Sequence, residues 1–149
     1  MDIQLGDVSH IIQLAIAPVF LLTGVGTNLM VLTNRLARII DRSRVLEEHL
    51  QATGEPDPPR YGAELETLYS RAHLINRAIT LSTSCALLVC LVIAALFLGD
   101  ALDLKLAKLI ALLFVLAMMT LIGSFVYLLR EIFIATSTLS LHRSFTQSK

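Results

Sequence analysis

Three long stretches of the chain contain no Lys, Arg, Asp or Glu, and they limit the possible folds more than any other feature. They are residues 11–34, 78–99 and 109–129. Each can cross a lipid bilayer, which takes about 20 mostly apolar residues. The composition agrees, because 55% of the residues are hydrophobic and 16% are charged, against about 25% charged in ordinary soluble domains. The sequence therefore predicts an all-α membrane protein with three long transmembrane helices, in which residues 1–149 form a single membrane domain.

The first stretch does not have the features of a cleavable signal peptide. The residues before it include Asp2 and Asp7 and no Lys or Arg. A signal peptide has a basic N-terminal region and a shorter apolar core. We therefore expect this stretch to remain as a membrane span.

The distribution of arginines predicts the orientation. Seven arginines lie between residues 35 and 77, whereas the connection between the second and third stretches contains Asp100, Asp103 and Lys105. Cytoplasmic segments of membrane proteins are enriched in Lys and Arg. We therefore expect residues 35–77 and the tail 130–149 in the cytoplasm, and the N-terminus and the 100–105 turn outside.

A seven-residue spacing of mainly apolar side chains extends the spans beyond the membrane. It covers residues 36–53 and 65–79, which are separated by the proline-rich GEPDPPR of residues 54–60. Such spacing is typical of helices packed at a shallow angle, as in a coiled coil, and prolines interrupt a helix. The sequence predicts a cytoplasmic antiparallel helical hairpin at about 35–77, which the tail can join. The members are Leu36, Ile39, Ser43, Leu46, Leu50, Thr53, Leu65, Leu68, Ala72, Ile75 and Ile79, and Ile134, Thr138, Leu141 and Phe145 in the tail.

Polar residues form a stripe on the first span, with Thr23, Thr27 and Asn28 at its centre. Small and hydroxylated residues let membrane helices approach closely and bond to one another, so helix packing is one interpretation. The other is a hydrated path, because rings of polar side chains around a symmetry axis can pass ions. A lipid or small cofactor held between the helices is a third.

Charged residues continue this stripe at the cytoplasmic end of the spans. They can form a basic mouth for a pore or a cluster of ion pairs that anchors the helices. The candidates are Arg35, Arg38, Asp41, Arg42, Arg77 and Glu131.

No motif for catalysis or cofactor binding is present in the sequence. His10, His49, His73 and His142 are dispersed, and neither a zinc-protease helix nor a phosphate-binding glycine loop occurs. Cys85 and Cys90 point to different faces of one helix and fit as packing residues. The sequence therefore predicts no enzymatic activity, no catalytic or metal-binding residues and no cofactor, and the zero net charge gives no indication of a nucleic-acid partner.

The run AIAPVFLLTGVGTNLMVLTNRLARIIDRSRVLE, residues 15–47, resembles the signature of a bacterial family of small three-span inner membrane proteins. That family is known as a domain of unknown function, and its pattern places LTNRLARIIDR at the membrane exit. The resemblance implies the same architecture and a bacterial plasma-membrane location, and it implies no activity.

These observations lead to two functional hypotheses. The first is a homo-oligomer with pore or channel character, because a bundle of three helices cannot bury all the polar residues of its spans without a neighbouring subunit. The alternative is an accessory or scaffold subunit of a larger complex, with another membrane protein as partner in the bilayer.

Overall fold

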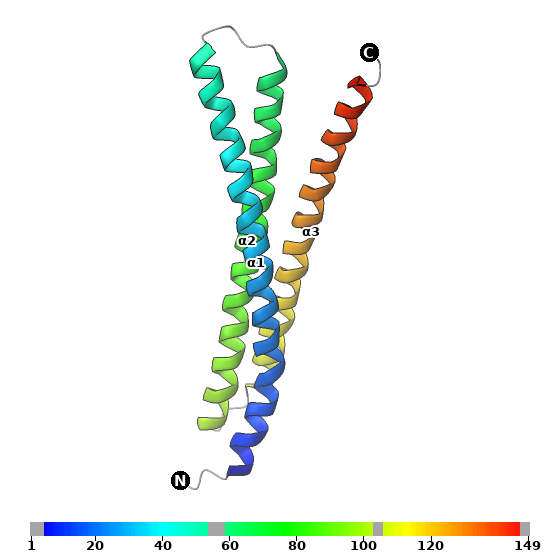
Figure 1. Ribbon diagram of the computed structural model, residues 1–149. Coiled ribbons are helices and arrows are strands. Elements are labelled where there is room, and N and C mark those ends of the chain that lie inside the picture. The colour runs from blue at the N-terminus through cyan, green and yellow to red at the C-terminus, as the bar shows by residue number, and fades with distance from the viewer. Residues whose placement is uncertain (1–4, 54–58, 103–105, 147–149) are drawn as a thin grey trace. The chain divides into compact units, whose positions relative to one another are not determined.

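The computed structural model describes residues 5–53, 59–102 and 106–146, and these residues form three helices (Figure 1). Helix α1 covers Leu5–Thr53, α2 covers Pro59–Ala101 and α3 covers Ala107–Thr146. No strand occurs within the described ranges. The predicted all-α class is therefore confirmed.

Each helix is long and apolar enough to cross a membrane. The predicted spans 11–34, 78–99 and 109–129 lie within α1, α2 and α3 respectively. Helix α1 has 49 residues, which at about 1.5 Å per residue is roughly 70 Å. A bilayer core is about 30 Å thick, so α1 continues well past its apolar run. The placement of this continuation in the cytoplasm stays a prediction.

Two prolines mark how the sequence shapes these helices. Pro59 is the first residue of α2, where its fixed φ suits a helix and its missing N–H is not needed. Pro18 lies inside α1, which continues through it as one helix. Pro18 is also buried, so its ring packs within the protein.

Much of the surface is apolar. Large hydrophobic side chains are exposed on all three helices, including Phe20, Leu87, Leu112 and Phe133. Contiguous exposed apolar surface of this kind is rare in soluble monomers. It fits helices that face lipid.

The chain divides into two compact units, and each helix contributes a segment to both. Unit 1 comprises residues 1–30 and 80–123. Its core is a cluster of Val25 from α1, Cys85 and Val89 from α2, and Ala117 and Leu121 from α3. All three helices therefore meet in this core.

Unit 2 comprises residues 31–79 and 124–149. Its core contains Leu32, Ile39 and Leu46 from α1, seven residues apart, together with Leu68 and Ile75 from α2. The predicted seam residues Leu36, Leu65, Ala72 and Ile79 pack against this core. The seven-residue spacing therefore identified the packed faces of α1 and α2. The side chains of Leu50, Thr53, Thr138, Leu141 and Phe145 lie outside the described residues.

Candidate functional site

The polar stripe of α1 is divided between the interior and the surface of unit 1. Asn28 is 7% exposed, and its Nδ2 donates a hydrogen bond to Ser82 Oγ of α2 at 2.8 Å. Ser82 is fully buried. An amide in an apolar helix needs such a partner, because an unsatisfied polar group in a membrane costs several kcal/mol. Asn28 thus joins α1 to α2.

Thr23 and Thr27 lie on the exposed side of α1. Thr23 Oγ1 donates to Val19 O at 3.4 Å, and Thr27 Oγ1 donates to Thr23 O at 3.1 Å. Both hydroxyl groups are therefore satisfied by their own helix. The structure places these two residues together and turns Asn28 away from them.

Two glycines flank the threonines on this exposed side. A Cβ atom built on Gly24 or on Gly26 would meet no atom within 4 Å. The bulky side chains of Phe20 and Met30, which are 75% and 66% exposed, lie on either side along the helix. We call Thr23, Gly24, Gly26 and Thr27 the α1 small face.

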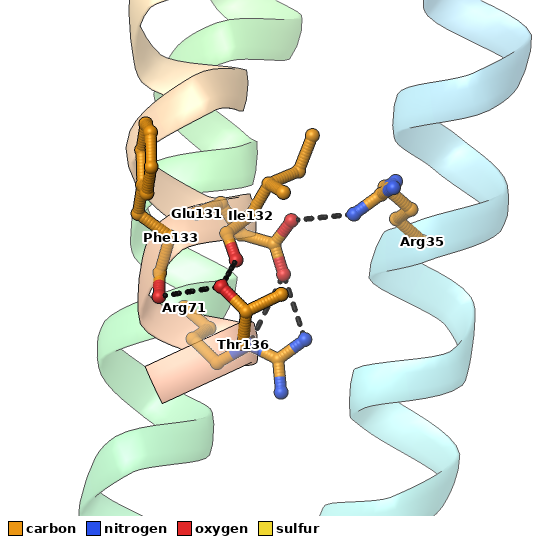
Figure 2. A network of polar contacts seen from close by, with 6 residues as sticks. All are labelled: Arg35, Arg71, Glu131, Ile132, Phe133 and Thr136. Atoms are coloured by element: carbon orange, nitrogen blue, oxygen red, sulfur yellow. Dashed lines mark hydrogen bonds and ion pairs between the residues drawn. The ribbon is translucent and has the colours of Figure 1, made fainter. Parts of the chain in front are cut away.

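One buried carboxylate joins all three helices of unit 2 (Figure 2). The Glu131 side chain of α3 is 1% exposed. Its Oε2 accepts a hydrogen bond from Arg35 Nη1 of α1 at 2.8 Å. Its Oε1 accepts two from Arg71 of α2, from Nε at 3.0 Å and from Nη2 at 2.7 Å. We call Arg35, Arg71 and Glu131 the three-helix clamp.

Two of the three clamp residues lie just after the apolar runs of their helices. Arg35 is the first charged residue after the run 11–34, and Glu131 follows closely after the run 109–129. One turn beyond Glu131, Thr136 Oγ1 donates to the carbonyl groups of Ile132 and Phe133 (Figure 2). A buried ion pair is costly to break, because removal of one partner leaves an uncompensated charge.

The structure brings together some members of the predicted charged cluster and separates others. Arg35 and Glu131 are in contact, whereas Arg42 pairs with the partly exposed Glu64 at 2.9 Å. Arg38, Asp41 and Arg77 are exposed. Among the described residues, Asp41 makes no ion pair.

Arg71 is not among the candidate site residues predicted from the sequence, where it contributes only to the predicted orientation. The spacing of Arg71 from its apolar neighbours nevertheless indicates where its side chain lies. Arg71 follows the buried Leu68 by three positions and precedes the buried Ile75 by four, and Arg35 stands in the same way between Leu32 and Ile39. Both arginines therefore lie at the edge of the packed face, where a third helix can reach them.

The described residues offer no group of three or more His, Cys, Asp or Glu side chains that could hold a metal ion. Cys85 is buried and Cys90 is exposed, and both are free thiols.

An open apolar pocket of about 300 Å³ lies on unit 1. Its lining includes Ile12, Val19 and Phe20 of α1 and Ile93 and Phe97 of α2. A hydrocarbon chain matches this lining better than a polar cofactor does.

A comparison with families of known proteins gives a match. A family model described as a protein of unknown function (DUF2721) matches residues 15–141. Neither the curated proteins nor the solved structures gave a match.

Proposed function

The chain belongs to the DUF2721 family, and on this premise we propose that it is a non-enzymatic integral membrane protein that assembles with copies of itself through the α1 small face. In this proposal the N-terminus lies outside and the C-terminus lies in the cytoplasm of a bacterial inner membrane. The assembly serves as a scaffold or accessory component in that membrane.

The observation that carries this proposal is the exposure of the α1 small face. Small residues at a membrane-helix surface let a second backbone approach closely. The face is bordered by two protruding side chains, Phe20 and Met30, which can pack against the corresponding face of a second copy. The threonine hydroxyls are satisfied within α1, so they need no buried partner at such a contact.

A pore around a symmetry axis is the second candidate, and the exposed line of Thr23 and Thr27 favours it. Asn28, however, is bonded to Ser82 inside unit 1. An axial path would then be lined by the two threonines without the amide. Packing accounts for both the exposed threonines and the inward Asn28, which is why we rank it first.

Two measurements on Thr27→Leu separate these candidates. The purified protein is placed in lipid nanodiscs for subunit counting and in liposomes for ion flux. Ala111→Leu is the matched control, since Ala111 is an exposed small residue on the apolar part of α3. Assembly through the α1 small face predicts that Thr27→Leu lowers the subunit number, that Ala111→Leu does not, and that no variant conducts.

Other outcomes decide against this ranking. Flux in the wild type that Thr27→Leu abolishes would establish the pore, because an apolar ring favours dewetting. A wild type that is monomeric in nanodiscs, or a subunit number unaffected by Thr27→Leu, would overturn assembly through this face.

A further inference from the structure

We infer that the three-helix clamp, together with Arg38, binds the phosphate group of an anionic phospholipid. This inference goes beyond the proposed assembly and depends on the membrane placement of the apolar runs. It follows from three features of unit 2, which are excess positive charge, unused hydrogen-bond donors and position.

The clamp has more positive than negative charge. Two guanidinium groups face one carboxylate, so one positive charge is in excess. The carboxylate is also more deeply buried than the two guanidinium groups. The Glu131 side chain is 1% exposed, whereas those of Arg35 and Arg71 are 39% and 24% exposed. An approaching anion therefore meets the arginines before it meets the carboxylate.

Both arginines keep donors that the described residues do not use. Arg35 bonds Glu131 through Nη1, and Arg71 bonds it through Nε and Nη2. Nε and Nη2 of Arg35 and Nη1 of Arg71 make no hydrogen bond to another described residue. In Figure 2 the remaining terminal nitrogen of Arg71 points away from the carboxylate. Glu131 holds both planar groups in place, and a fixed guanidinium group suits phosphate oxygens.

The position of the clamp matches the lipid headgroups. Arg35 directly follows the apolar run 11–34, and the end of a span lies at the headgroup level of the bilayer. Basic sites between transmembrane helices are known binding places for anionic headgroups. Exposed Arg38 lies one turn further along α1, so its side chain neighbours that of Arg35. Exposed Asp41 lies one turn beyond Arg38 and opposes the site with a negative charge.

The test measures phosphatidylglycerol binding to the full-length protein in phosphatidylcholine nanodiscs. Spin-labelled phosphatidylglycerol is the probe, and its immobilised fraction is titrated for each variant. Arg38→Gln should weaken binding roughly fivefold, which is the effect expected for one arginine near a membrane surface. Asp41→Asn should tighten binding by a similar factor, because it removes the opposing charge. Lys108→Gln, at the exposed start of α3, should leave binding unchanged.

Two further measurements show whether the site binds the phosphate of a lipid or free phosphate. Spin-labelled phosphatidylcholine should show no specific immobilisation, because its headgroup has no net charge. Inorganic phosphate added to the phosphatidylglycerol titration should displace little lipid. Displacement at low millimolar phosphate would assign the site to the free ion and overturn the lipid inference. Equal binding by Arg38→Gln, Asp41→Asn and Lys108→Gln would overturn the site itself. The immobilised fraction of lipid is measured without reference to the subunit number, so this test can succeed or fail independently of the proposed assembly.

Discussion

Arg35 and Glu131 are separated by 96 positions in the chain, and Arg35 Nη1 lies 2.8 Å from Glu131 Oε2. The contact joins α1 to α3, and the same carboxylate holds Arg71 of α2. A single side chain of α3 thus bonds to both other helices of unit 2.

Glu131→Gln should destabilise the protein, because it leaves two guanidinium groups without a counter-charge. We expect a loss of about 2–4 kcal/mol, somewhat below the value for fully buried pairs because both arginines are partly exposed. Helix loss in mixed detergent micelles, followed by circular dichroism, would measure it. Glu64→Gln is the control, since its pair with Arg42 is exposed and should contribute less than about 1 kcal/mol. Equal losses for the two variants would contradict the clamp.

The Asn28–Ser82 hydrogen bond can be measured by a double-mutant cycle. Asn28→Ala and Ser82→Ala should each lower stability, and the coupling between them should be about 0.6 kcal/mol, the average for membrane helices. Thr27→Ala combined with Ser82→Ala is the matched control. Its coupling should be zero, because the Thr27 hydroxyl bonds within its own helix. Zero coupling between Asn28 and Ser82 would show that the amide does not join α1 to α2.

Replacing glycine by alanine should stabilise the protein at an open surface position more than at a closely packed one. Gly24→Ala places its Cβ in open space, so the monomer should gain up to about 1 kcal/mol of helix stability. At Gly123 a Cβ would lie 3.2 Å from Leu81 Cδ1, so the Leu81 side chain must shift and the gain should be smaller or reversed. Thermal unfolding of both variants in detergent that keeps the protein monomeric tests this order. A larger gain for Gly123→Ala would contradict it.

Cysteine labelling tests the predicted orientation. Asp100→Cys and Glu48→Cys, both at exposed positions, are placed in a background without Cys85 and Cys90. An impermeant maleimide added to intact cells should label residue 100 and should label residue 48 only after lysis. The reverse pattern would invert the assignment.

The sequence was sufficient to predict the helices and their packed faces, because hydrophobic length and seven-residue spacing are local properties. Ile39, Leu46 and Ile75 show this, since all three belong to the predicted seven-residue pattern and lie in the core of unit 2. The resemblance to a family of unknown function, stated from the run 15–47, agrees with the family match.

The partners of the polar residues could not be predicted in the same way. Thr27 and Asn28 are adjacent, about 100° apart on a helix, and a stripe as wide as the predicted one contains both. Only the packing of α2 decides that Asn28 faces inward to Ser82. The sequence places Glu131 in a charged cluster with five other residues without assigning its partners. Its pairing with Arg35 and Arg71 depends on the rotation of α3, which sequence spacing does not determine.

The shared carboxylate also bears on how the protein is made. Helices α1 and α2 leave the ribosome before α3 and carry both arginines of the clamp, whereas Glu131 is supplied by α3. Until α3 arrives, the nascent hairpin holds two guanidinium groups that face an incomplete interior. Docking of α3 therefore supplies the counter-charge that α1 and α2 lack, so the three helices of unit 2 complete their polar interior only after α3 has been made.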